Sequence, residues 1–393
     1  RIGRAGSGAS SGMAMAHWEI QGWMILILGW VFVPFYSRSM VYTMPEFLER
    51  RFNPASRTIL SLISLISYVL TKVAVTVYAG GLVFQQVFGI DTLWGIDFFW
   101  IAAIGLVLIT AVYTIFGGMK SVLYTSVLQT PILLLGSLII LVLGLKELGG
   151  WDEMMRICSD VKVNEYGDTM TNLIRDNRDG QYPWLGALVG SAVIGFWYWC
   201  TDQFIVQRVL SGKNEKEARR GTIFGAYLKL LPVFLFLIPG MIAFALHQQT
   251  GSFLPLTDGG LVNSDAAFPT LVAKLLPAGI KGVIVCGILA ALMSSLASLF
   301  NSSSALFTID FYKRFKPNTD PKKLVRIGQA ATVVIVLLGI LWIPIMRSIG
   351  DVLYLYLQDV QSVLAPGIAA AFLLGILWKR CSAQGLSLIH ISE

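Results

Sequence analysis

The sequence predicts an all-α, polytopic membrane protein, and its composition and its apolar runs carry that prediction. Only 13% of the 393 residues are charged, 55% are hydrophobic, and the mean hydropathy is +0.69. A soluble domain carries about 25% charged residues. The apolar residues form runs long enough for helices that cross a bilayer, which needs about 20 residues. The strict alternation of barrel strands is missing, and lipid tolerates only helices and closed barrels, so the fold is expected to be helical.

The apolar runs predict one incomplete span and nine complete ones. The incomplete span, about Ala5–Ala16, is rich in glycine and serine. The longest runs exceed the bilayer thickness, so tilt or a cytoplasmic extension is expected there. The complete spans are expected near Ile20–Tyr36, Thr58–Val87, Phe98–Phe116, Val122–Leu145, Trp184–Val206, Ile223–Leu246, Gly279–Phe311, Ala330–Met346 and Val352–Trp378.

Basic residues alternate between the short loops and predict the orientation. The loop after the sixth span, which starts with Arg208, is rich in lysine and arginine, whereas Gly89–Asp97 and His247–Pro269 contain none. Cytoplasmic loops retain positive charge, which places the basic loops inside the cell and the mixed segment Lys146–Pro183 outside. The net charge of +7 is therefore a topology signal, and no nucleic-acid partner is expected.

Ionisable residues inside the spans are costly in lipid and are functional candidates for that reason. Lys72 lies in the third span and Lys229 in the seventh, while Glu19 and Gln358 lie near apparent span ends. Lys72 is about one turn inside the hydrophobic length, which disfavours snorkelling to the interface. For Glu19 and Gln358, a functional role and a simple position at the interface both stay open.

The eighth span carries a line of small and hydroxyl-bearing residues at helical spacing, which we call the serine stripe. One interpretation is hydrogen bonding between helices, which contributes only about 0.6 kcal/mol in membranes. The other is a site for a hard cation, because hydroxyls and carbonyls supply neutral oxygens. The serine stripe consists of Ala291, Ser294, Ser295, Ser298 and Ser302.

Two further segments allow more than one interpretation. Gly6–Gly12 is a poor helix, so it serves either close helix packing or a break at membrane depth that exposes backbone groups. The run Trp197–Trp199 lies mid-span and is followed by Asp202 and Gln203. Clustered aromatics form interfacial belts, but rings beside polar groups also suit a sugar, whose C–H face stacks on them.

Several motifs in a fixed order resemble the sodium/solute symporter family, and within it the sodium/glucose cotransporter branch. The resemblance covers about Ile2–Gly385. The motifs are Tyr42–Phe52, Gly117–Thr125 with Gln129, Trp197–Gln203, Ala290–Asn301 and Pro366–Arg380.

The resemblance implies the leucine-transporter fold, with two inverted five-helix repeats whose first and sixth helices are broken. The first repeat is expected over about 1–147, an external loop over 148–183 and the second repeat over about 184–380. The tail 381–393 does not fit the family pattern. The opening helix and the later helices of the family have no counterpart, so the fold is expected to be incomplete and the chain truncated at both ends.

The resemblance also implies roles for individual residues. Sodium is expected at Ala291, Ser294 and Ser295. Ser126 stands where the family usually has aspartate, which puts the family's inner charged group in doubt. The solute is expected to contact Glu19, Lys72, Lys229 and Gln358, with Tyr198 as the inner gate and Trp199 beside it.

These features lead us to expect sodium-coupled symport of a small solute across a bacterial inner membrane. The expected solute is a monosaccharide such as glucose or galactose, with sodium co-transported, and no enzymatic activity is expected. A sodium symporter for myo-inositol, sialic acid, proline or a carboxylate is the main alternative, because Lys72 and Lys229 could each pair with a carboxylate. A channel or a membrane enzyme is disfavoured, because no selectivity-filter or HExxH motif is present.

Overall fold

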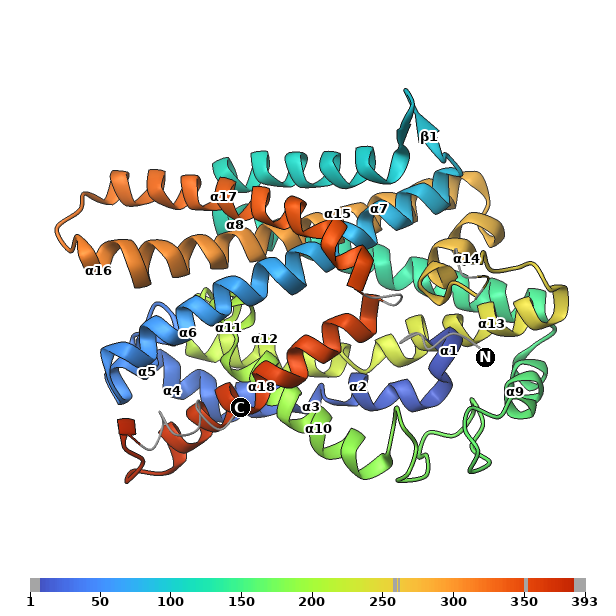
Figure 1. The fold of residues 1–393 in the computed structure, drawn as a ribbon, viewed down its shortest axis with the longest axis horizontal. Coiled ribbons are helices and arrows are strands. Elements are labelled where there is room, and N and C mark those ends of the chain that lie inside the picture. Colours follow the sequence, from blue (N-terminus) through green and yellow to red (C-terminus); the bar gives the residue numbers. More distant parts are fainter. Residues whose placement is uncertain (1–7, 257–259, 261, 350–352, 385–393) are drawn as a thin grey trace.

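The structure, a computed structural model, describes residues 8–256, 260, 262–349 and 353–384. Within this part of the chain almost all regular structure is helical, and the only paired strands are those of one short hairpin. In Figure 1 the long helices run side by side along the molecule, with α7, α15 and α17 on one side and α3, α10 and α18 on the other.

Eight helices within the described residues are long and apolar enough to cross a membrane. A ninth is present if Trp23–Ser39 and Met44–Arg51, which meet at 72°, are taken as one bent span. Each of the nine expected spans overlaps one of these helices. The eight are Pro54–Phe88, Phe98–Ile115, Val122–Leu148, Trp184–Thr201, Glu215–Thr250, Ala278–Phe315, Pro321–Ile345 and Asp359–Leu377.

The elements of the first half combine α-helices with tighter and wider turns. The 3-10 turn is η1, and the π-helical turns are η2 and η3. In order they are α1 (Gly8–Ser11), η1 (Gly12–Met15), α2 (Ala16–Ile20), α3 (Trp23–Ile27), η2 (Leu28–Phe32), α4 (Val33–Ser39), α5 (Met44–Arg51), α6 (Pro54–Ser67), η3 (Tyr68–Val73), α7 (Ala74–Phe88), β1 (Thr92–Leu93), β2 (Ile96–Asp97), α8 (Phe98–Leu148) and α9 (Trp151–Asp160).

The second half is built in the same way. The turns η4, η5 and η7 are π-helical, whereas η6 is 3-10. In order the elements are α10 (Trp184–Phe196), η4 (Trp197–Thr201), α11 (Gln203–Leu210), α12 (Glu215–Leu228), η5 (Val233–Leu237), α13 (Ile238–Thr250), η6 (Ser264–Ala266), α14 (Ala267–Leu275), α15 (Ala278–Ala305), η7 (Leu306–Tyr312), α16 (Lys313–Phe315), α17 (Pro321–Ile349) and α18 (Leu353–Leu377).

The first span is broken at Gly12, whose φ of +58° lies in the left-handed region. Met13 donates its backbone N–H to the carbonyl of Met170 at 2.8 Å, and Arg175 donates to the carbonyl of Ser11 at 2.5 Å. A Cβ at residue 12 would lie 2.1 Å from the Met170 oxygen, so only glycine allows this approach. Segment 148–183, expected outside the membrane, therefore supplies partners for the broken backbone.

Segment 148–183 is itself ordered by charged hydrogen bonds. The side chain and backbone N–H of Arg178 donate to Asp176 and hold the pKa of that carboxyl at about 2. Asn164 donates to Asp168 at 2.8 Å and to Asp179 at 2.7 Å. The segment therefore has a defined structure that can hold the broken first span in place.

A second break separates α10 and η4 from α11. Asp202 adopts an extended conformation (φ −75°, ψ 126°), and its carboxylate accepts a hydrogen bond from the backbone N–H of Phe204 at 3.0 Å. This side chain caps the start of α11 as an N-cap aspartate does. Broken helices of this kind place free backbone and polar groups at membrane depth.

The connection between the fourth and fifth expected spans is helical in the structure. Helix α8 includes residues 116–121, where we expected a loop around Lys120. Figure 1 shows its two apolar segments running in opposite directions, as separate spans require. The side chains of 116–121 lie outside the described part of the chain.

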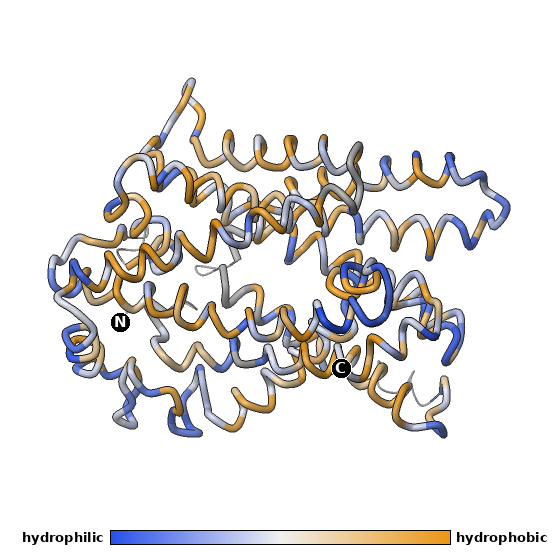
Figure 2. Tube along the Cα trace, turned by 180° about the vertical axis from the view of Figure 1, so that it is seen from behind, coloured by the Kyte–Doolittle hydropathy of each residue, from blue (hydrophilic) through white to orange (hydrophobic). Residues whose placement is uncertain are grey.

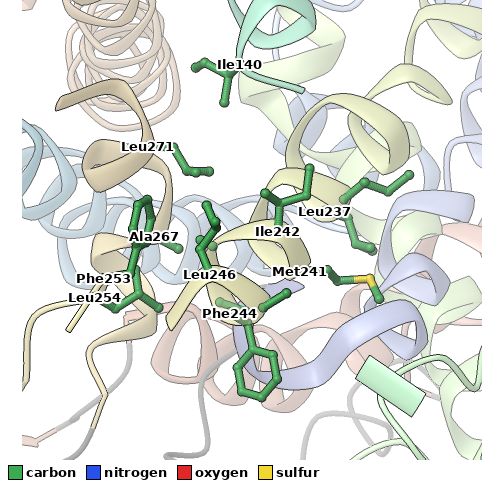
Figure 3. Packing of buried hydrophobic residues seen from close by; sticks show 14 of the residues in the cluster. Ile140, Leu237, Met241, Ile242, Phe244, Leu246, Phe253, Leu254, Ala267 and Leu271 are labelled. Atoms are coloured by element: carbon green, nitrogen blue, oxygen red, sulfur yellow. The ribbon is translucent and has the colours of Figure 1, made fainter. Parts of the chain in front are cut away.

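Packing follows the pattern expected in lipid. A large buried cluster surrounds α13, where Met241, Ile242 and Phe244 contact neighbouring helices (Figure 3). Many large apolar side chains, such as Leu128 and Leu341, instead lie on the outer surface. Figure 2 shows hydrophobic residues along the long helices and hydrophilic ones gathered mainly in connecting segments. An outer surface of this kind suits hydrocarbon rather than water.

Candidate functional site

The first ion pair of the site joins Lys72 to Asp202 across the helix bundle. Lys72 lies on η3 and Asp202 at the break of the sixth span. Their side chains are 7% and 2% exposed. The hydroxyl of Tyr68 donates to the same carboxylate. Because the carboxylate also accepts from Phe204, the negative charge of Asp202 is fully compensated by described partners.

Aromatic rings surround the ammonium of Lys72. Its Nζ lies 4.8 Å from the ring centre of Tyr68, 4.7 Å from that of Tyr198, 5.6 Å from that of Trp197 and 5.0 Å from that of Phe204. Cations are attracted to the faces of such rings within about 6 Å. Lys72 is therefore held by its carboxylate and its rings.

The second ion pair joins Lys229 to Glu19. Lys229 ends α12, and Glu19 lies on α2, directly after the broken first span. Their side chains are 22% and 21% exposed, so this pair is open to solvent or to a bound molecule. Gly22 allows the approach, because a Cβ there would lie 2.7 Å from Cγ of Lys229.

One unsatisfied polar atom lies near the second pair, and another belongs to a residue close to Glu19 in the sequence. Nε1 of Trp199 and Oε1 of Gln21 are buried and lack hydrogen-bond partners among the described residues. The Trp199 ring lies 5.8 Å from Nζ of Lys229. Gln21 is two residues from Glu19, and its Oε1 lies 2.9 Å from where a Cβ of Gly195 would be. Buried polar groups in proteins are normally paired, so the unpaired Nε1 of Trp199 near Lys229 is a candidate contact for a ligand.

The Tyr198 and Trp199 rings connect the two pairs, with their centres 4.9 Å apart. The structure thus links Glu19, Lys229, Trp199, Tyr198 and Lys72 through successive contacts. Gln358 lies on α18, but its side chain is outside the described residues. Sequence reasoning gave no role to Tyr68 or Gln21; the polarity of Gln21 at the start of the second expected span was the only available signal.

The expected sodium residues lie on α15. Ser294 is buried, and Ala291 and Ser295 are partly buried. The hydroxyl of Ser294 lies 2.6 Å from that of Ser126 on α8, and the hydroxyl of Ser298 donates to the carbonyl of Ser294 at 3.0 Å. The oxygens seen here are neutral hydroxyls and a carbonyl, and oxygen is the ligand type that hard cations take.

Arg208 lies against the serine stripe. We counted it among the residues of a cytoplasmic loop, but α11 continues to Leu210 and contains it. Its Nη2 donates to the hydroxyl of Ser298 and to the carbonyl of Ser294, the latter at 3.1 Å. Sequence reasoning ended the sixth span at Val206 and did not consider that the helix after the break at Asp202 continues through Arg208.

A cluster at the expected cytoplasmic end joins several elements. The buried carboxylate of Asp310 accepts hydrogen bonds from Thr43 at 2.8 Å and from Arg57 at 2.7 Å. Gln203, the neighbour of Asp202, accepts from the backbone N–H of Met44 at 2.8 Å. The break in the sixth span is thereby connected to the turn before α5 and to the end of the eighth span.

Broken helices and buried ion pairs within a bundle of apolar spans are typical of a multi-spanning secondary transporter. A sequence model of the sodium:solute symporter family matches residues 1–389, and the chain belongs to that family. The proteins it resembles are transporters rather than enzymes.

Individual relatives agree with this assignment. The human sodium/myo-inositol cotransporter is 38% identical over 411 residues, which cover 98% of this chain and 56% of that protein. The rabbit (Oryctolagus cuniculus) sodium/myo-inositol cotransporter 2 is 38% identical over 402 residues, covering 98% of this chain and 59% of that protein. The chain thus spans somewhat more than half the length of these relatives.

A solved structure confirms the fold. A Na+-coupled sialic acid symporter in a substrate-bound outward-open state matches with a TM-score of 0.78. The match covers 96% of this chain and 76% of that chain at 24% identity. The all-α, leucine-transporter-like fold and the multi-pass membrane location that we expected are therefore confirmed.

Proposed function

We propose that this chain contains the binding sites of a sodium-coupled symporter for a neutral, polyhydroxylated ring, either a cyclic polyol such as myo-inositol or a monosaccharide. One observation carries this proposal: each lysine of the site is already paired with a carboxylate. The pairs are net neutral, and Nε1 of Trp199, whose ring lies near Lys229, is a buried donor without a partner among the described residues.

The chemistry of a polyol matches the Glu19–Lys229 pair. Neighbouring hydroxyls on a ring can donate to the carboxylate and accept from the ammonium at the same time. Hydrogen bonds to charged groups contribute about 1.5–3 kcal/mol each. The Trp199 ring beside this pair offers a flat surface for the C–H face of the ring. The site therefore offers both the polar and the apolar contacts that such a solute needs.

A carboxylate solute fits less well. At Lys229 it would share one ammonium with the carboxylate of Glu19. Two carboxylates at such close range repel each other, so an anionic solute is disfavoured at this partly exposed pair. The sialic acid symporter that matches in structure is under 25% identical, so its solute is not carried over to this chain.

Sodium in this proposal binds the neutral oxygens of Ala291, Ser294 and Ser295. Coupling requires that sodium raise the affinity for the solute, and by linkage the solute then raises the affinity for sodium equally. The repeats, which we place at about 1–147 and 184–380, move against each other around the central site. A potential of 100 mV supplies about 2.3 kcal/mol per charge. We keep the bacterial inner membrane as the proposed location.

Uptake into proteoliposomes that contain the full-length protein tests the proposal. We expect labelled myo-inositol or glucose to accumulate under an inward sodium gradient and not in choline. Unlabelled polyols and sugars should compete, whereas sialic acid and proline should not. Equal uptake in sodium and choline would exclude coupling, and competition by carboxylates alone would exclude the neutral-solute site.

A further inference from the structure

Arg208 is a partly buried cation that lacks a carboxylate partner among the described residues. Its Nη2 donates to the Ser298 hydroxyl and the Ser294 carbonyl, its Nε is buried without a partner, and its guanidinium lies 5.0 Å from the ring centre of Phe204. An arginine does not lose its proton in a protein, so this charge is permanent. A permanent charge inside a membrane domain is costly and needs an explanation.

The position of the Arg208 charge next to the proposed sodium ligands explains its presence. Ser294 belongs to the proposed sodium ligands, and its carbonyl accepts from Arg208. Ser298, the other acceptor, lies one turn further along the serine stripe and is fully buried. The oxygens that hold the guanidinium are thus next to, or part of, the set that would hold sodium. A sodium ion and the guanidinium on neighbouring oxygens would repel each other strongly, because little water is present to screen the two charges.

We propose that Arg208 is a tethered cation that competes with sodium for the oxygens of the serine stripe and thereby promotes sodium release. The inference rests on the proposed sodium site. When the guanidinium contacts Ser294 and Ser298, sodium is disfavoured. When sodium occupies the site, the guanidinium moves away. In this proposal Arg208 changes the transport rate through the occupancy of the sodium site.

The location of Arg208 couples this exchange to the solute site. Helix α11 begins at the break at Asp202, shortly after Tyr198 and Trp199. In this proposal a shift of α11 moves the guanidinium toward or away from α15. A solute that contacts Tyr198 or Trp199 would change the conformation at the break and so the position of α11. Sodium occupancy and the position of α11 are linked in both directions.

The alternative is that Arg208 only fastens α11 to α15, and sodium titrations separate the two roles. In Arg208→Gln the side chain keeps hydrogen-bond donors but loses its charge. For the full-length protein in proteoliposomes, we expect the half-saturating external sodium concentration to fall about tenfold and net turnover to fall several-fold. Exchange of labelled for unlabelled solute at saturating sodium should be retained. Arg208→Lys, which keeps the charge, should leave the half-saturating sodium concentration within about twofold of wild type.

Arg219→Gln is the matched control. Arg219 donates to the carbonyl of Gly29 at 3.2 Å, and its side chain is 42% exposed. We expect unchanged sodium dependence in this variant. If Arg208→Gln lowers turnover but leaves the half-saturating sodium concentration unchanged or raised, Arg208 is a fastener and the inference fails. If wild type itself transports equally in choline, the proposed function fails instead.

A second variant covers poor folding of Arg208→Gln. Ser298→Ala removes an acceptor of Arg208 and leaves the charge and the proposed sodium ligands in place. The freed guanidinium should compete less well, so the half-saturating sodium concentration should fall about threefold. An unchanged or increased value would contradict the competition.

Discussion

Lys72 and Lys229 each pair with a carboxylate inside the same helix bundle, but their surroundings differ. The Lys72–Asp202 side chains are 7% and 2% exposed, and four aromatic rings lie within 6 Å of the ammonium. The Lys229–Glu19 side chains are 22% and 21% exposed, and the ammonium has the single ring of Trp199 beside it at 5.8 Å among the described residues. The same chemistry therefore occupies a closed environment in one region and an open one in the other.

From this difference we infer separate roles for the two pairs. A closed pair cannot exchange its partner for a solute without leaving a charge uncompensated, so Lys72–Asp202 holds the third span against the break of the sixth. An open pair can bind a solute while its partners stay together. In the described structure Lys72 contacts Asp202 and the aromatic rings, and its direct contact with the solute stays a prediction.

Breaking the closed pair, Lys72–Asp202, should have the largest effect on stability. We expect Lys72→Met or Asp202→Asn to lower the free energy of unfolding by about 3–5 kcal/mol, because each leaves a buried partner unpaired. Unfolding in detergent, followed by heat or denaturant, measures the change. The double variant with Lys72→Met and Asp202→Asn removes both charges but keeps a side-chain acceptor for Tyr68 and Phe204, and it should recover most of the loss. Single variants that stay within about 1 kcal/mol of wild type would show that the pair is not closed.

Breaking the open pair, Lys229–Glu19, should change solute affinity more than stability. Glu19→Gln should change the free energy of unfolding by only about 0–1 kcal/mol, since the pair is partly exposed. The KM for the solute should rise about tenfold or more, because hydrogen bonds to charged groups contribute about 1.5–3 kcal/mol. Glu217→Gln, at the exposed pair with Arg220, is the control for both measurements. A large loss of stability with an unchanged KM would reverse the roles of the two pairs.

An intermediate effect on stability is expected at Tyr68, whose hydroxyl donates to the carboxylate of the closed pair and accepts from the backbone N–H of Phe204. Tyr68→Phe keeps the ring next to Lys72 but removes the hydroxyl that donates to Asp202. The loss of one hydrogen bond to a charged group should lower the free energy of unfolding by about 1.5–3 kcal/mol. Tyr42→Phe, at a side chain that is exposed, should have no effect. A change in KM without a change in stability would place Tyr68 at the solute site instead.

The sequence could predict the spans and the candidate lysines but not their different surroundings. Apolar runs mark the helices, and a lysine in such a run is conspicuous wherever it lies. The partners, however, are 130 residues away for Lys72 and 210 for Lys229. Local patterns carry no information on contacts at that distance, so both lysines received the same interpretation.

The serine stripe shows the same limit. Helical spacing places its members on one face of α15, which the structure has. The contacts of that face come from Ser126, 168 residues from Ser294, and from Arg208, 90 residues from Ser298. Arg208 was assigned to a loop because its charge follows an apolar run, and only the packing of α11 on α15 shows it as a neighbour of the stripe.

Trp197 and Trp199, on either side of Tyr198, offer the smallest but most specific test of the comparison. Trp199→Phe keeps an aromatic ring near Lys229 and removes an N–H that has no described partner, so stability should be unchanged or slightly higher. The KM should rise about threefold, because a neutral hydrogen bond contributes about 0.5–1.5 kcal/mol. Trp197→Phe is the matched control, since this ring is buried and faces Lys72. It should lower stability and leave the KM unchanged, because a smaller ring leaves space beside the closed pair. If both variants change the same quantity, the closed and open pairs do not have separate roles.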